Sequence, residues 1–467
     1  MYPPAFFAFI FIRPSFYQFT GLNLPKYAYH QLSKNISDCY ICNFDWFYQP
    51  LQGLIDVALI AQSGNTAELS ALGLATQLLA VVFVSFNFLQ YATSGQTAQA
   101  IGQKTTSTSI LIAIWWRACL MALVFGLLLF VSQKVISNLG LSLLSGSFQA
   151  KLAAQNYLSV RFLDAPAQLI YFSISGFLIG LGQTRLLFLV QSSLTLSNII
   201  LSLVFVKIFH LGIVGIALGT TIAFWMGVFW GIWLIKRQLR LSIKEFLSFK
   251  KQEFTKSKLK QLLMLNKDIF IRTLILTLCF AWITKLASLH GDVFLASYTL
   301  LMQIMTLSAY ALDGIALATE TLCGMAIGKQ KRLVFYLAVK KTGIIIAIFA
   351  CILSIIWFYG IDVYLHLLAK NPSVFAVAKQ HSGFVIILPI IGVWAYWLDG
   401  VYFGATAGQQ IRCAYLLSGA LFFIGSVFLS IYFSTIAIYL SIYLLFILRA
   451  GFLGVFLPKL TAIKFSQ

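Results

Sequence analysis

The first half of the chain carries GNTAELSALGLATQLL at residues 64–79 and TSGQTAQAIGQ at residues 93–103, and the second half carries the related stretches GDVFLASYTLLMQIM at 291–305 and ATETLCGMAIGKQ at 318–330. Another pair follows at nearly the same offset, with GFLIGLGQTR at 176–185 and GVYFGATAGQQIR at 400–412. An internal repeat of this length is typical of membrane proteins that are built from two copies of one unit. The sequence therefore predicts two halves with one architecture.

The composition places both halves in a membrane. Of the 467 residues, 60% are hydrophobic and only 10% are charged, and the mean hydropathy is +0.89. A soluble domain carries about 25% charged residues, whereas a bilayer accommodates helices of about 20 apolar residues. The formal net charge of +20 comes from basic residues between the apolar runs, so it indicates topology signals rather than a nucleic-acid partner.

Hydropathy predicts an all-α polytopic membrane protein with twelve transmembrane helices. The apolar blocks cover residues 43–63, 69–95, 108–133, 153–182, 186–208, 211–235, 268–290, 294–327, 341–366, 376–405, 411–433 and 436–458. They form two sets of six, and because six is even, the two copies have the same orientation. The two pseudo-symmetric six-helix bundles are then related by an axis along the membrane normal, with a cleft between them.

One long polar stretch separates the two sets and fixes the predicted domain organisation. It is rich in lysine, so the positive-inside rule places it in the cytoplasm together with both termini. The predicted units are an N-terminal segment, a first bundle, a basic cytoplasmic linker and a second bundle, at residues 1–35, 36–236, 237–265 and 266–467. The expected location is the inner (plasma) membrane of the cell.

Charged residues inside the spans are the candidates for chemistry, because each costs at least about 2.5–3.5 kcal/mol there. Asp56 lies six residues after Pro50, where a helix bend beside a titratable acid can form a proton switch. Its position leaves a second interpretation open, a structural carboxylate that is hydrogen-bonded to a neighbouring helix.

The other intramembrane acids are secondary candidates. Asp313 and Asp399 each precede a glycine in an LDG motif, where close helix packing favours a structural role. Glu320 lies on the same helix face as Asp313 and either lines the cleft or lies near the cytoplasmic end. Arg272 in the seventh span needs an acidic partner, so it is expected to neutralise one of these carboxylates.

Polar side chains in the fifth and sixth spans complete the candidate set. Asn198 and Ser202 are one helical turn apart, and Thr220 lies in the next span; taken alone, such residues are ordinary contacts between helices. Cys39 and Cys42 form a C-x-x-C pair that lacks the ligands of a zinc site. We expect no metal and no cofactor apart from a coupling ion, H⁺ or Na⁺.

Five stretches together resemble the multidrug and toxic compound extrusion (MATE) transporters of the DinF-like branch. In chain order they are QPLQGLIDVALIA, TSGQTAQAIGQ, NKDIFIRTLIL, YALDGIALATETLCGMAIGK and WLDGVYFGAT. The resemblance runs from about Pro50 to Pro458. It implies two bundles in a V, alternating access, and export of amphipathic, often cationic compounds against an inward flow of H⁺ or Na⁺.

The resemblance also implies roles for single residues. Asp56 corresponds to the proton-coupling aspartate of the first helix, with Asn198 and Thr220 in its polar network. Ser202 stands where many relatives carry a second aspartate. The sequence upstream of Pro50 departs from the family, because Asp38 and Asp45 interrupt an otherwise apolar helix half.

The leading hypothesis is therefore a cation-coupled antiporter, not an enzyme, that exports small amphipathic or cationic compounds and acts as a monomer among membrane lipids. One alternative is a lipid-linked oligosaccharide flippase, which would line its cleft with several basic residues; we expect only Arg272 and Lys285 in such positions. A membrane-embedded enzyme that acts on lipid ranks last, since no catalytic cluster is visible.

Overall fold

Helices make up nearly all of the computed structural model, which describes residues 52–53, 55–60, 66–103, 107–144, 147–242, 245–246, 255–369 and 371–465. Pro50 and the predicted N-terminal segment 1–35 lie outside the described residues, as do Cys39 and Cys42. The helix bend that the sequence predicts at Pro50 therefore stays a prediction.

The helices follow one another with short connections. Those of the first half are α4 (Thr66–Val84), α5 (Phe88–Gly102), α6 (Thr108–Val131), α7 (Gln133–Leu143), α8 (Phe148–Arg161), α9 (Ala165–Gly180), α10 (Thr184–Leu203) and α11 (Gly212–Gln238). Those of the second half are α13 (Lys256–Ser288), α14 (Asp292–Gly328), α15 (Arg332–Leu368), α16 (Pro372–Gly404), α17 (Gly408–Phe433) and α18 (Ile436–Lys464). Two short turns, η1 (Phe162–Asp164) and η2 (Val204–Ile208), extend α8 and α10.

Eleven helical stretches of the described residues are long and apolar enough to cross a membrane. They coincide with the second to the twelfth predicted spans, and α4 with α5, like α8 with α9, forms one continuous stretch. Residues 55–60 are helical and belong to the first predicted span. A helix suits such apolar segments because it satisfies its backbone polar groups internally, which the hydrocarbon of a bilayer cannot do.

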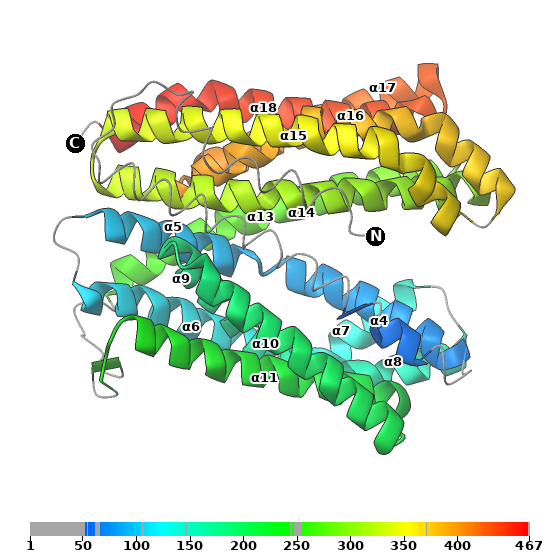
Figure 1. Ribbon diagram of the computed structural model, residues 1–467, viewed down its shortest axis with the longest axis horizontal. Coiled ribbons are helices and arrows are strands. Elements are labelled where there is room, and N and C mark those ends of the chain that lie inside the picture. The colour runs from blue at the N-terminus through cyan, green and yellow to red at the C-terminus, as the bar shows by residue number, and fades with distance from the viewer. Residues whose placement is uncertain are drawn as a thin grey trace.

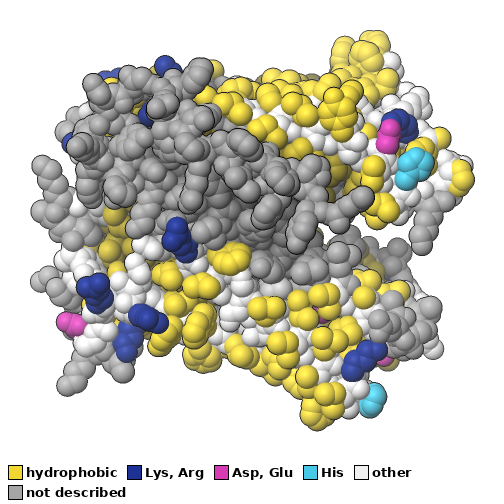
Figure 2. Space-filling model, in the orientation of Figure 1, with side chains coloured by type: hydrophobic (Ala, Val, Ile, Leu, Met, Phe, Trp, Pro, Cys, Tyr) yellow, Lys and Arg dark blue, Asp and Glu magenta, His cyan; other side chains and the backbone are white. Residues whose placement is uncertain are grey.

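The helices form two bundles that lie side by side (Figure 1). The first bundle contains α4 to α11 and the second contains α13 to α18, and α5 lies against α14 where the bundles meet. Hydrophobic side chains cover much of the sides of both bundles on the face shown in Figure 2. This arrangement is the predicted pair of bundles, with an exterior suited to lipid.

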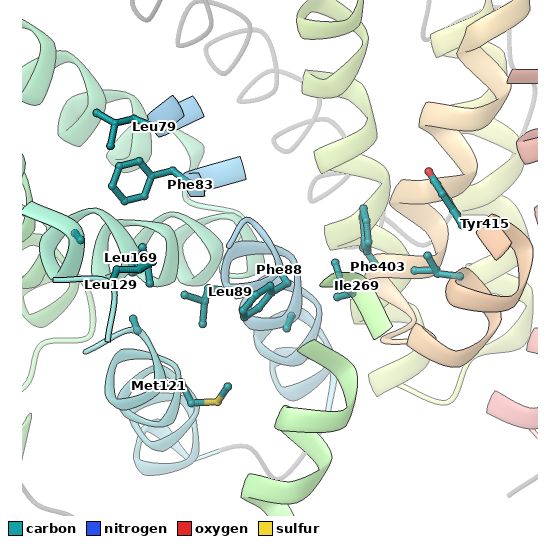
Figure 3. Packing of buried hydrophobic residues seen from close by; sticks show 14 of the residues in the cluster. Leu79, Phe83, Phe88, Leu89, Met121, Leu129, Leu169, Ile269, Phe403 and Tyr415 are labelled. Carbon is teal, nitrogen blue, oxygen red and sulfur yellow. The ribbon is translucent and has the colours of Figure 1, made fainter. Parts of the chain in front are cut away.

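An apolar core joins the two bundles where α5 meets α13 and α16. Figure 3 shows Phe88 of α5 beside Ile269 of α13, with Phe403 of α16 just beyond, and all three belong to one buried cluster. The ring of Phe88 also meets that of Phe270 edge-on, with centroids 6.2 Å apart. Contact between the bundles is therefore partly a packed hydrophobic interface.

The linker between the bundles is attached to the first one. Helix α11 continues to Gln238 and α13 begins at Lys256, inside the segment that the sequence predicts as linker. Between them, the indole Nε1 of Trp116 donates a 2.9 Å hydrogen bond to the carbonyl oxygen of Phe246. Hydrogen bonds from Ser242 to the exposed Glu245 carboxylate hold the pKa of that group below its usual value.

Glycines allow the two bundles to touch backbone to backbone along a line that we call the seam. A methyl group on Gly102 of α5 would lie 2.3 Å from the carbonyl oxygen of Met325 in α14, and one on Gly328 of α14 would lie 2.0 Å from the carbonyl oxygen of Gln99 in α5. The contact is reciprocal, because Gly102 and Gly328 occupy equivalent places in the two repeats. The repeat axis therefore passes close to this pair.

Hydrogen bonds and one ring stack extend the seam. The side-chain amide of Gln99 donates to the carbonyl oxygen of Gly404 at 2.8 Å, and the hydroxyl of Thr321 donates to the carbonyl oxygen of Ile179 at 2.9 Å. The rings of Tyr91 and Phe403 stack with centroids 4.2 Å apart. The seam thus joins the C-terminal ends of α5, α9, α14 and α16. A basic residue follows each of these ends in the sequence: Lys104, Arg185, Lys329 and Arg412.

Candidate functional site

In the first bundle, Asp56 lies in a polar cluster that we call the first cluster. Only 7% of Asp56 is exposed, and Arg161 at the end of α8 and Ser202 in α10 lie beside its carboxyl group. Three segments that are far apart in sequence therefore supply this cluster. The structure brings together Asp56 and Ser202, both of which the sequence singled out.

Arg161 and Asp164 are members of the first cluster that sequence reasoning missed. They form an ion pair across the end of α8, and both side chains are buried. Tyr157, one turn earlier on α8, contacts Arg161 as well. The signal was available in the sequence, because an Arg-x-x-Asp pair stands inside the apolar block 153–182.

Asn198 and Thr220 join α10 to α11 next to this cluster. The amide of Asn198 donates a 2.8 Å hydrogen bond to the hydroxyl oxygen of Thr220, which itself donates to the carbonyl oxygen of Ile216. Gly219 of α11 packs against Ser202, one turn along α10 from Asn198. These polar residues therefore line one contact between α10 and α11, and Ser202 connects that contact to Asp56.

The second bundle holds a different arrangement around Asp399, which we call the second cluster. A single carboxylate oxygen, Oδ2, accepts from Arg272 at 2.6 Å, from Arg449 at 3.0 Å and from the hydroxyl of Tyr415 at 2.6 Å. Arg449 also donates to the Tyr415 oxygen at 2.6 Å. The acidic partner that the sequence required for Arg272 is thus Asp399.

Buried arginines are more numerous than the sequence analysis expected. The expectation that Arg272 and Lys285 are the well-placed cations was wrong, because Arg117, Arg161 and Arg449 are buried within spans while Lys285 is exposed. The hydropathy pattern gave no sign of Arg449, because it is a single charge within an apolar block, in the stretch ILRAG. Its guanidinium is only 1% exposed and needs the carboxylate of Asp399.

Asp313 and Glu320 lie in different places on α14. Asp313 is half-buried and interacts electrostatically with Arg272, Arg449 and Asp399, so it faces the second cluster. Glu320 is 1% exposed and lies in the seam beside Ser94 of α5. Gly400 packs against the Ala316 carbonyl, which is the close helix approach that the second LDG motif predicts. Among the described residues, no group of three His, Cys, Asp or Glu is placed to hold a metal ion.

Two apolar helical bundles related by a repeat, each with buried charges at its centre, define the class of secondary transporters. Residues 44–204 and 269–411 match the MatE family, so the chain belongs to that family, the MATE transporters, and to its DinF-like branch. The family is one of multidrug efflux transporters and not of enzymes. The chain is therefore an integral membrane protein.

Sequence relatives support this assignment. The chain is 30% identical over 375 residues to DNA damage-inducible protein F of Escherichia coli (strain K12), which covers 79% of this chain and 80% of that protein. It is 21% identical over 267 residues to the multidrug export protein MepA of Staphylococcus haemolyticus, which covers 57% of this chain and 58% of that protein.

Solved structures share the fold. The D35N mutant of the Vibrio cholerae MATE transporter VcmN has a TM-score of 0.82 at 16% identity, over 95% of this chain and 100% of that chain. An outward-facing MATE family transporter of the MOP superfamily has a TM-score of 0.78 at 16% identity, over 93% of this chain and 96% of that chain. These likenesses confirm the predicted twelve-helix fold of two bundles.

Proposed function

We propose that this chain is a proton-coupled antiporter that exports amphipathic or cationic organic compounds by alternating access. The observation that carries the proposal is the charge balance of the first cluster. Arg161 already pairs with Asp164, and Asp56 lies beside the same guanidinium. Two carboxylates thus share one cation, and a low-dielectric site tolerates the second carboxylate only when another positive charge joins it.

That second positive charge is either a proton on Asp56 or the cationic group of a substrate. Because both neutralise one carboxylate, binding of one disfavours binding of the other. Competition of this kind couples inward proton flow to outward substrate flow. The multidrug export named for the relative MepA supports the export of organic compounds of more than one kind by this chain.

A proton suits the first cluster better than Na⁺. A metal cation needs several oxygen ligands in a closed shell, and Ser202 supplies only a neutral hydroxyl beside Asp56. A proton needs only the one carboxyl of Asp56. We therefore assign coupling to H⁺.

The seam supports alternating access. The bundles are joined at the ends of α5 and α14 that precede the basic loops, and in Figure 1 they diverge toward the opposite end. If the basic loops are cytoplasmic, the seam closes the transporter on that side. A reporter that is active only in the cytoplasm should work when fused at Gln467 or inserted near Gln252, and silence at either position would contradict this orientation.

The test of the function is transport in inverted membrane vesicles that contain the protein. A fluorescent cationic dye should move across the membrane when a pH gradient is imposed, and much less when a Na⁺ gradient is imposed instead. Empty vesicles supply the background. Dye movement that is indifferent to both gradients would remove the antiporter, and movement driven by Na⁺ alone would replace the coupling ion.

A further inference from the structure

The seam contains a buried acid, Glu320, to which the proposed transport cycle gives no role. It is 1% exposed, and Ser94 on the opposite bundle lies beside its carboxyl group. The next residue, Thr321, makes a hydrogen bond across the seam, and Gly404 packs on the Glu320 carbonyl. Glu320 therefore lies in the seam, two turns before Gly328 on α14.

The surroundings of Glu320 contain little positive charge. Ser94 of α5 lies beside its carboxyl group and Tyr91 of α5 interacts with it electrostatically, and neither is a cation. Asp313 lies two turns away on α14 itself, and Asp399 of α16 is the nearest acid on that helix. α9 carries no charged residue. Among the other charged groups on the helices packed against α14, Arg272 pairs with Asp399 and Asp268 pairs with Arg412. Arg332, Asp362 and the lysines of α13, α15 and α16 whose side chains are described are exposed or half-exposed.

One oxygen of the carboxyl, Oε1, is buried without a hydrogen-bond partner among the described residues. An ionised carboxylate sealed between helices without a cation costs several kcal/mol, whereas the neutral acid costs much less. Separation of the bundles would let water reach the carboxyl and remove that cost. The closed seam and the protonated acid therefore stabilise each other.

We propose that Glu320 is a second proton-binding site, distinct from Asp56, and that its protonation stabilises the closed seam. With a proton on Glu320 the seam closes, and loss of the proton to water favours the open form. The inference rests on the proposed alternating access, since it assumes that the seam opens during transport. It adds control of that opening by pH on the side of the basic loops.

The repeat supports one proton-binding acid in the seam rather than two. The reciprocal contact of Gly102 with Gly328 places Ser94 and Glu320 at equivalent positions in the two halves. A hydroxyl in one copy therefore faces a carboxyl in the other, near the repeat axis. One proton then accompanies each closure, which fixes the size of the expected pH effect.

The experiment measures seam opening without substrate and without a gradient. Spin labels are placed at two exposed positions that flank the seam, Gln103→Cys and Lys331→Cys, after replacement of the seven native cysteines. Inter-label distances are recorded in lipid nanodiscs over a range of pH. The ratio of open to closed protein should rise with pH by up to about tenfold per unit, the limit for release of one proton.

Variants locate the proton. Glu320→Gln should abolish the pH dependence and keep the short distance, whereas Glu320→Asp should keep a pH dependence with a displaced midpoint. Asp362→Asn removes an exposed carboxylate of α15 and serves as the matched control, which should behave like the native protein. If Glu320→Gln does not fold, the Asp variant alone tests the site, since an unchanged midpoint would overturn the proposal.

Two results would contradict proton binding by Glu320 at the seam. One is a native protein whose inter-label distances do not change with pH, and the other is a Glu320→Gln variant with the native pH dependence. Failure of the proposed function looks different. In that case vesicles show no gradient-driven dye export, while the pH-dependent distances persist. The distance measurement and the transport assay therefore report on the two proposals separately.

Discussion

The two bundles share one architecture but arrange their buried charges differently. In the first cluster the carboxylates of Asp56 and Asp164 share the guanidinium of Arg161. In the second cluster the guanidiniums of Arg272 and Arg449 share the carboxylate of Asp399. In the first bundle two acids therefore share one cation, whereas in the second bundle two cations share one oxygen of Asp399, with Asp313 nearby.

This difference indicates which buried acid can bind a proton or another cation. Asp399 receives three donors on one oxygen, so a further cation would have to displace an arginine that is itself buried. Asp56 shares its cation and lies beside a neutral hydroxyl, so a proton can join it without breaking an ion pair. Under the proposed function, ion coupling therefore belongs to the first bundle and Asp399 has a structural role.

The largest effect is expected for Asp56→Asn. Asparagine keeps the shape of the side chain but cannot bind and release a proton, so dye export driven by a pH gradient should fall to the background of empty vesicles. The protein should still insert and purify as a folded species. Export of dye down its own gradient would be retained.

The matched control is Asp362→Asn, which neutralises an exposed acid of α15 and should transport at the native rate. Full transport by Asp56→Asn with an unchanged pH dependence would show that the coupling site is wrong. Glu320 would then be the next acid to test.

A large loss of stability is expected for Asp399→Asn. The substitution leaves two buried guanidiniums without their shared anion, which costs about 3–5 kcal/mol for a broken buried pair. Thermal unfolding in detergent should show a clearly lower midpoint. Adding Arg449→Met to Asp399→Asn should recover part of the loss, because it removes one of the unpaired charges.

The same variant, Asp399→Asn, also tests whether the second cluster rather than the first is the coupling site. If Asp399→Asn kept the native stability and instead lost the response of transport to a pH gradient, the second cluster would be the coupling site. The roles assigned to the two clusters would then be exchanged.

A moderate effect is expected for Asn198→Ala. The change removes the hydrogen bond to Thr220 between α10 and α11, which is worth about 1 kcal/mol. Transport should slow severalfold while its dependence on the pH gradient is kept. Thr220→Ser, which retains the hydroxyl, should transport nearly as well as the native protein; an equal loss in both would point to packing rather than the hydrogen bond.

The smallest effect is expected for Thr321→Val in the seam. The hydroxyl of Thr321 divides its hydrogen between the carbonyl oxygens of Ile179 and Leu317, so its loss should weaken the contact by only about 0.5 kcal/mol. The ratio of open to closed seam, measured by spin-label distances at fixed pH, should roughly double. A change above about tenfold would mean that this bond, and not the glycine contacts, holds the seam.

Much of the candidate site could be predicted from single residues, and the rest depended on unexpected partners. Asp56, Arg272 and Asp399 stood out because a charge inside an apolar span is expensive. Arg449 and Arg161 obey the same rule but were missed, since each is one residue in a long apolar block that hydropathy averages over. Which charge pairs with which depends on helix contacts between distant segments, such as α16 with α18.

The membrane setting, the eleven described spans and the repeat could be predicted from the sequence, because apolar length and internal similarity are properties of the chain. Helix packing sets which charges meet: Asp56 and Asp164 share Arg161, Arg272 and Arg449 share Asp399, and Ser94 lies beside Glu320 across the seam. These pairings depend on the distance between side chains. Coulomb and hydrogen-bond interactions in a low-dielectric interior act over a few ångströms, and side chains more than a hundred residues apart meet at such distances only after the helices pack.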